Sequence, residues 1–190
     1  MQKYEICGTD FEGVYKVKPF VNEDARGAFI KDYSEEILNA NGIDHILKEV
    51  FYTYSHPGVI RAIHFQRVKE QAKLVRCVKG SIFDIIVDLR PKSKTFGKWQ
   101  GFYLNDKNAE QILVPKHFGH GYLVLEESIV SYKCDEKFYG EYDDGIRWDD
   151  KDIGVEWPLD KIGGRDHVIL SQKDLELQSF AEYRIKLGMK

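Results

Sequence analysis

The 190-residue sequence has few of the features that mark a disulfide scaffold, a membrane span or a nucleic-acid surface. Its 3 cysteines are an odd number without CxxC spacing, which indicates neither a disulfide framework nor a cysteine zinc site. No apolar run approaches the roughly 20 residues that a membrane-spanning helix needs. The first residues lack the basic and apolar regions of an export signal. The net charge of -3 argues against a nucleic-acid surface and a polybasic membrane anchor. We therefore expect a cytoplasmic protein that binds neither nucleic acid nor membrane.

Aromatic residues, by contrast, make up 13% of the chain, with 11 Tyr and 11 Phe, and this composition favours strands. Segments of strand-like composition recur every 8–12 residues or so, with turn residues between them. They are 13–20, 27–33, 49–55, 58–66, 73–80, 81–90, 98–105, 110–119, 120–128 and 129–138. The pattern predicts a mainly β protein with one domain over residues 1–190 and a core over about 13–175. Among such folds we expect a double-sheet jelly roll, which can enclose a central pocket.

Two short segments have helical character. Residues 34–42 begin with Ser34 as a candidate N-cap and end at Gly42. The tail places Ser171 three residues before Asp174, a capping-box-like spacing that predicts a C-terminal helix over about 172–188. The chain shows no alternation of strands and helices, so a Rossmann-type fold is not expected.

Polar side chains occur inside strands that otherwise look buried. They are Arg61, His64, Lys73, His120 and Tyr132. Buried polar groups cost free energy unless they are paired, so their concentration predicts a polar pocket inside the sandwich. Strict strand alternation would place Arg61 and His64 on opposite faces, and a twist or bulge is needed if both line that pocket.

Each of these residues also has a simpler structural explanation. His64 could be a hydrogen-bonded core or edge histidine, Lys73 a solvated strand end, and Tyr132 an ordinary core tyrosine. Cys77 lies in an apolar run, where a small buried side chain is expected rather than a catalytic thiol.

Metal and phosphate-loop chemistries find little support. His117 and His120 are three residues apart, a spacing that directs them to opposite faces of a strand. The acidic stretch 141–152 lacks the ligand spacing of a calcium-binding EF-hand loop. The sequence contains no Gly-rich phosphate loop, no GxSxG elbow and no Walker lysine. We predict no metal site.

Six sequence motifs, taken in their order and spacing, give a more specific indication of fold and function. They are GVIRAIHFQ, KLVRCVKGSIFDIIVDLR, SKTFGKWQGFYL, ILVPKHFGHGYLVL, GIRWDDKDIGVEWP and ILSQKD. Their order and spacing resemble the dTDP-4-dehydrorhamnose 3,5-epimerase family over most of the chain. The resemblance implies a metal-independent cupin jelly roll that needs no cofactor. It also implies a homodimer that epimerises a nucleotide-diphospho-4-keto-6-deoxyhexose at C3, with C5 left open.

The resemblance assigns a catalytic role to four residues: His64 as the general base, Asp174 as the carboxylate that orients it, Tyr132 as the proton donor and Lys73 near the enolate oxygen. This set makes chemical sense, because a base and an acid on opposite ring faces invert a centre next to a ketone. It further implies substrate-binding positions at Arg26, Phe29, Arg61, His120, Phe138, Asp143 and Lys173.

Some nucleotide- and sugar-facing positions depart from the family pattern. Lys31 replaces the usual Glu, Ala62 replaces a Gly, and the stretch LKEVFYTYS lacks the usual Gln-x-Asn. The reaction class is therefore expected to hold, while the nucleotide can be dTDP, CDP or GDP. The alternatives are a sugar-nucleotide 3,4-ketoisomerase and a cupin that binds a sugar nucleotide without catalysis.

Overall fold

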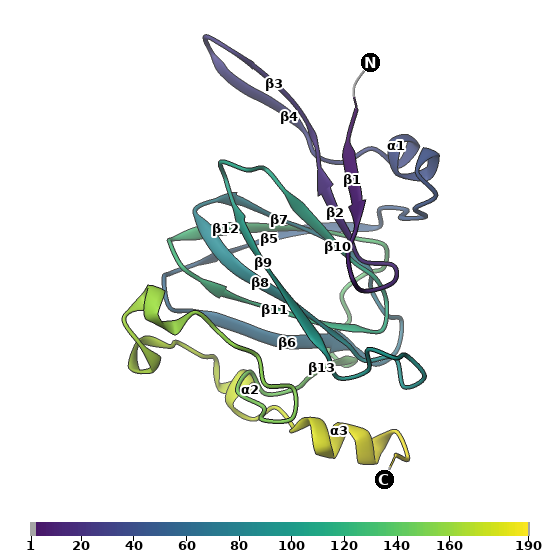
Figure 1. Ribbon diagram of the computed structural model, residues 1–190, viewed down its shortest axis with the longest axis vertical. Helices are drawn as coiled ribbons and strands as arrows, with labels where there is room; N and C mark the ends of the chain where they lie inside the picture. Colours follow the sequence, from purple (N-terminus) through teal and green to yellow (C-terminus); the bar gives the residue numbers. More distant parts are fainter. Residues whose placement is uncertain (1–2, 190) are drawn as a thin grey trace.

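The computed structural model describes residues 3–189 and consists mainly of antiparallel β-strands (Figure 1). The strands are β1 (Glu5–Gly8), β2 (Tyr15–Lys18), β3 (Phe20–Asp24), β4 (Gly27–Lys31), β5 (Glu49–Ser55), β6 (Ile60–Gln66), β7 (Lys73–Lys79), β8 (Ser81–Asp88), β9 (Trp99–Asn105), β10 (Gln111–Val114), β11 (Phe118–Val124), β12 (Ser128–Cys134) and β13 (Asp143–Gly145). The helices are α1 (Glu35–Ala40), α2 (Gln172–Leu175) and α3 (Phe180–Lys186), with 3-10 turns η1 (Leu159–Ile162) and η2 (Arg165–His167).

The strands form two main sheets and one hairpin. The larger sheet has the order β1-β2-β10-β7-β12-β5, and the smaller sheet has the order β13-β6-β11-β8-β9. Strands β3 and β4 pair only with each other and project from the body, at the opposite end from α2 and α3 (Figure 1). The mainly β, double-sheet architecture expected from the sequence is confirmed.

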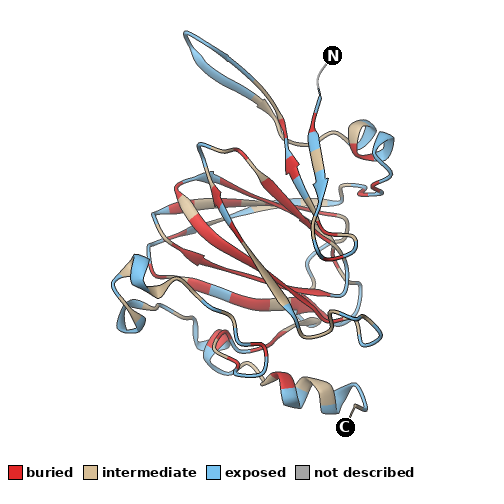
Figure 2. Cartoon of the chain, viewed as in Figure 1, coloured by how far each residue is buried: buried red, intermediate tan, exposed pale blue. Residues whose placement is uncertain are grey.

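Apolar side chains fill the space between the sheets, and Cys77 from β7 and Ile86 from β8 are both fully buried there. The outer face of the smaller sheet is covered by the C-terminal part of the chain, including Trp148 and Phe180. Because both of its faces are covered, β8 is buried along nearly its whole length (Figure 2). This explains the continuous apolar run in its sequence. Leu38 of α1 packs on the outer face of the larger sheet.

Three local expectations were wrong. The strands expected over 110–119 and 120–128 are β10 and β11, and the turn between them lies at residues 115–117, where Pro115 ends the first strand. The segment expected as one strand over 13–20 is divided between β2 and β3 at Pro19, which has no N–H to donate to a ladder. The expected C-terminal helix over 172–188 is two helices, each starting at its own serine cap, Ser171 and Ser179. Between them, the carbonyl of Gln178 accepts a hydrogen bond from the N–H of Arg147, which holds that stretch extended.

The short helix after residue 34 is present as α1, although the Ser34 side chain makes no capping hydrogen bond. Among residues 3–189, no helix combines the length and the apolar character required to cross a bilayer.

Candidate active site

A cavity of about 280 Å³ opens between the two sheets. Nine of the predicted site residues line it: Arg61, His64, Lys73, His120, Tyr132, Phe138, Asp143, Lys173 and Asp174. They come from both sheets, from α2 and, for Phe138, from the segment between β12 and β13, so the fold brings together groups that are far apart in sequence.

A β-bulge in β6 puts Arg61 and His64 on the same side of the strand. His120 of β11 pairs with His64, and Tyr122 pairs with Arg61, so β6 has one extra residue over this interval. The extra residue is accommodated opposite Gly121, where an added Cβ would lie 2.7 Å from the Cβ of Ala62. The irregularity that the sequence required at this point is therefore present.

His64 and Asp174 form a hydrogen-bonded pair. Nε2 of His64 lies 2.7 Å from Oδ1 of Asp174, and the Ser171 hydroxyl donates to Oδ2 at 2.6 Å. Burial by itself raises the pKa of Asp174, but these hydrogen bonds outweigh it and the pKa is lowered. Nδ1 of His64 is buried without a hydrogen bond from residues 3–189. With Nε2–H donated to the carboxylate, Nδ1 carries the lone pair that can accept a proton.

Tyr132 faces the cavity from the larger sheet. Burial, reinforced by the neighbouring Tyr122 side chain, raises its pKa well above 10. The ring of Phe51 stacks on it with centroids 4.8 Å apart and an interplanar angle of 18°. The phenol is therefore neutral at physiological pH and can serve as a proton donor.

Lys73 and His120 lie at the inner end of the cavity. Burial lowers the pKa of Lys73, an effect opposed by negative charge at neighbours that include Asp143 and Asp84. Nε2 of His120 lies 2.7 Å from Oδ2 of the fully buried Asp84, whose pKa is raised by burial. The site thus contains a lysine amine and an imidazole paired with a carboxyl group, both able to donate a hydrogen bond to a developing negative charge.

The outer rim of the cavity combines cations with an aromatic face. Lys173 pairs with Asp143, while Nε of Arg61 donates to the Ser55 hydroxyl at 3.1 Å. The Phe138 side chain is half-exposed. A rim of this kind suits a ligand that has both phosphate groups and a flat ring.

The structure does not bring Arg26 and Phe29 to this cavity. Both lie on the projecting β3–β4 hairpin, where Arg26 pairs with Asp24 at 2.6 Å and Phe29 packs edge-on against Phe20. Arg26 and Phe29 are exposed to solvent.

Sequence reasoning missed several cavity residues, among them Phe51, Thr53 and Ser171. It also missed Asp84, the partner of His120. A signal for Asp84 was present, because it is the one acid in the middle of the apolar run SIFDIIV. A buried carboxylate in such a run requires a partner.

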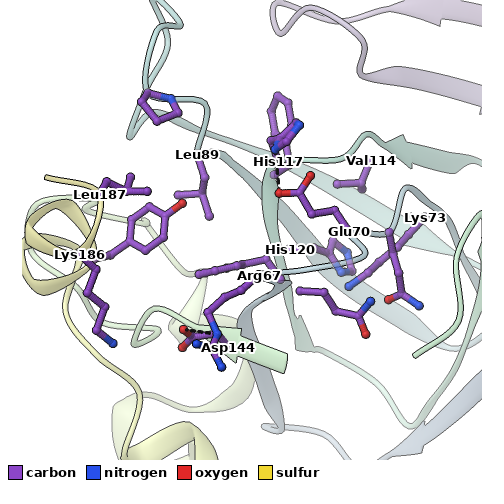
Figure 3. Close-up of a pocket in the computed structure, with 16 residues that line it drawn as sticks. Arg67, Glu70, Lys73, Leu89, Val114, His117, His120, Asp144, Lys186 and Leu187 are labelled. Carbon is purple, nitrogen blue, oxygen red and sulfur yellow. Dashed lines mark ion pairs between the residues drawn. The ribbon is translucent and has the colours of Figure 1, made fainter. Parts of the chain in front are cut away.

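A second cavity of about 390 Å³ shares Lys73 and His120 with the first (Figure 3). Four charged side chains that line it already have partners within the protein: Arg67 pairs with Asp144, and Glu70 pairs with His117. Neither His64 nor Tyr132 lines it, so it lacks the opposed base and acid.

Residues 8–182 match the family model described as dTDP-4-dehydrorhamnose 3,5-epimerase. The protein of that name from Methanothermobacter thermautotrophicus is 41% identical over 188 residues, covering 98% of this chain and 100% of that protein. The structure of a dTDP-6-deoxy-D-glucose-3,5-epimerase from Legionella pneumophila, in complex with dTDP-4-keto-L-rhamnose, superposes with a TM-score of 0.89 at 30% identity. The match covers 97% of this chain and 96% of that one.

A 3′-monoepimerase from Streptomyces bikiniensis, in complex with dTDP-quinovose, gives a TM-score of 0.84 at 26% identity, covering 100% and 91% of the two chains. The predicted cupin-type jelly roll is confirmed by these neighbours. Taken with the family match over nearly the whole length, they show that the chain belongs to the dTDP-4-dehydrorhamnose 3,5-epimerase family.

Proposed function

We propose that this isomerase epimerises a nucleotide-diphospho-4-keto-6-deoxyhexose at C3 and C5. The observation that carries the proposal is the placement of His64 and Tyr132 on facing sheets around one cavity, with Lys73 at its inner end. An imidazole nitrogen with an available lone pair and a protonated phenol on opposite sides of a ring are what inversion of a carbon centre requires.

In the proposed reaction, Nδ1 of His64 removes a proton from the carbon next to the C4 ketone. Asp174 stabilises the resulting imidazolium, since its carboxylate accepts the Nε2–H. The charge that develops on the ketone oxygen is stabilised by a hydrogen bond from Nζ of Lys73. Tyr132 then donates its proton to the other face of the same carbon. Because C3 and C5 are both adjacent to C4, one set of groups can act at either centre.

The rim supports binding of the nucleotide. Phe138 offers an exposed ring face on which a base can stack, and Arg61 and Lys173 supply cations for a diphosphate. The relatives named above are enzymes of dTDP-sugars, which favours dTDP over CDP and GDP as the nucleotide.

We also propose that the chain acts as a homodimer, with the β3–β4 hairpin of one copy reaching the cavity of the other. Arg26 and Phe29 resemble substrate-binding residues of the family, yet neither lines the cavity of its own chain, and the β3–β4 hairpin that carries them projects from the body (Figure 1). The edge strand β5 also exposes Tyr52 and Tyr54, a surface that a second copy can cover. Mixing the inactive variants Arg26→Ala and His64→Ala should restore activity if the hairpin acts in trans, and no recovery would contradict this arrangement.

A nucleotide-activated sugar and the free, buried Cys77 and Cys134 both suit a reducing compartment. We therefore place the reaction in the cytoplasm.

The reaction is tested by NMR with dTDP-4-keto-6-deoxyglucose in deuterated water, repeated with the CDP and GDP analogues. We expect deuterium at C3 and C5, fastest with dTDP, and a rate at least ~10²-fold lower in His64→Ala. Deuterium at C3 alone would restrict the activity to one centre. A product with its carbonyl moved to C3 would identify a ketoisomerase, and binding without exchange would identify a binding protein.

A further inference from the structure

The β3–β4 hairpin is tied to the larger sheet by Asp32, the residue that directly follows β4. We propose that Asp32 is a positioning residue, which holds the hairpin at the angle that brings Arg26 and Phe29 to a nucleotide sugar bound in a second copy of the chain. The inference rests on the proposed function, in which the hairpin of one copy completes the cavity of the other.

The carboxylate of Asp32 joins the hairpin to two strands of the sheet. Its Oδ2 accepts hydrogen bonds from Nη1 of Arg76 on β7 at 3.1 Å and from Nζ of Lys133 on β12 at 2.9 Å. The backbone carbonyl of Asp32 accepts a third, from Nε2 of Gln111 on β10 at 2.9 Å. Strands β10, β7 and β12 are neighbours in the larger sheet, so one residue is bonded to three adjacent strands.

Both cations are buried and have Asp32 as their charge partner. Arg76 is 5% exposed and Lys133 is 6% exposed. Among residues 3–189, no other acidic side chain forms an ion pair with either of them. Burial alone raises the pKa of Asp32, but the hydrogen bonds and charges of Lys133 and Arg76 outweigh it, and the pKa is lowered. Since a buried charge without a partner is costly, these three groups are held together more firmly than a surface ion pair.

The direction of the hairpin is set at its base. Strands β3 and β4 pair only with each other, and both become exposed to solvent away from the base (Figure 2). Phe20 and Tyr33, which flank the base, pack on the apolar cluster of the outer face of the sheet, but apolar packing is not directional. The Tyr33 hydroxyl bonds to the backbone of the loop before β5. Asp32 therefore supplies the directional link to the sheet itself.

This link is made to strands that also carry catalytic candidates. Lys73 on β7 and Tyr132 on β12 line the cavity. Arg76 and Lys133, at an odd number of positions from them, lie on the opposite face of the sheet. In a two-fold dimer, the bonds of Asp32 in one copy then define where its hairpin lies relative to the cavity of the other. A hairpin that is correctly placed for one tenth of the time weakens binding about tenfold without changing the chemistry.

The experiment measures the mobility of the hairpin and the affinity for nucleotide in the full-length protein. In Asp32→Asn, which keeps the size of the side chain and removes its charge, we expect the amides of residues 20–31 to exchange about tenfold faster. We expect the affinity for dTDP, measured by calorimetry, to fall about tenfold and KM to rise as much, with kcat unchanged. With Arg26→Ala and Phe29→Ala already present, Asp32→Asn should cause no further loss of affinity. Unchanged exchange, or a further loss in that background, would overturn the proposal.

A mixture of two variants shows in which copy Asp32 acts. Asp32→Asn is mixed with an excess of His64→Ala, so that most chains with an intact His64 are in mixed dimers. There, the cavity that keeps His64 receives a hairpin with an intact Asp32, and KM should return to the wild-type value. A KM that stays raised would contradict the action between copies that we propose.

Two further variants complete the comparison. Lys133→Met guards against a folding defect in Asp32→Asn, because it leaves Arg76 paired with the carboxylate; it should change exchange and affinity in the same direction, and no change would count against the proposal. Glu110→Gln is the matched control, since it removes a carboxylate that pairs with Lys16 of the same sheet, and it should equal the wild type. If the wild type incorporates no deuterium into the 4-keto sugar, the epimerase function fails, while amide exchange and dTDP affinity still test the role of Asp32.

Discussion

Replacing Asp174 by Asn tests the proposed catalytic pair of His64 and Asp174 most directly. The change keeps the size of the side chain but removes the charge that faces His64, whose Nε2 lies 2.7 Å from Oδ1. The two side chains are 23% and 6% exposed, so the pair is largely shielded from water. With charge centres about 4 Å apart and an effective dielectric constant of about 20, the imidazolium loses about 4 kcal/mol of stabilisation.

A loss of about 4 kcal/mol corresponds to a rate about 10³-fold lower. A second effect acts in the same direction, because the amide N–H₂ of the new Asn can donate to Nε2. That donation moves the imidazole proton to Nδ1, the nitrogen that is proposed to act as the base.

The assay is the initial rate of deuterium incorporation into the 4-keto sugar, with binding measured separately by calorimetry. We expect kcat to fall about 10³-fold while affinity changes little. Asp144→Asn is the matched control, since it removes a carboxylate from the adjacent β13 that does not line the catalytic cavity. A loss smaller than about tenfold in Asp174→Asn would refute the reasoning.

Three further predictions concern the catalytic role of Lys73, the packing around Gly121 and the stability of the fold in acid. Lys73→Met should lower kcat by about 10²-fold or more with little change in KM; a rise in KM alone, measured by steady-state kinetics, would contradict its role at the enolate oxygen. Gly121→Ala should destabilise the fold by about 1–3 kcal/mol in urea unfolding, because its Cβ would meet the backbone carbonyl of Arg61 at 2.8 Å. Burial alone raises the pKa of Asp88, but hydrogen bonds from Arg90, Ser93 and Thr95 lower it to about 2. A lowered folded-state pKa contributes stability above the unfolded pKa of about 4, and that contribution is lost as the pH falls towards 2. Asp88→Asn should therefore flatten the loss of stability measured between pH 4 and pH 2, and an unchanged slope would count against this assignment.

The strand pattern could be predicted because aromatic and β-branched runs alternate with turn residues along the chain. The position of Pro19 divided one of those runs, and the pairing of Gln178 with Arg147 divided the tail helix. The first effect is local and was readable from the sequence. The second depends on a contact between segments that are distant along the chain, which no local pattern contains.

The candidate site, too, was predictable only in part. His64 and Lys73 were recognisable as polar residues in apolar strands, and the resemblance to a family added Asp174. The need for an irregularity between Arg61 and His64 could be predicted, but its position opposite Gly121 and the hydrogen bond between Tyr122 and Thr53 could not, because each depends on how strands from different parts of the chain lie against one another.

The covering of the smaller sheet by the C-terminal segment has a consequence for the order of synthesis. His64 and Asp174 are separated by 110 positions, and the segment that carries Asp174 also covers the sheet that carries His64. On the ribosome, the sheets can begin to assemble while the carboxylate is still untranslated. The nascent chain therefore holds an imidazole without its partner until the last part of the sequence is made. If the proposed roles hold, the pair of His64 and Asp174 forms together with the burial of the final apolar face, and a chain that ends before Asp174 lacks both.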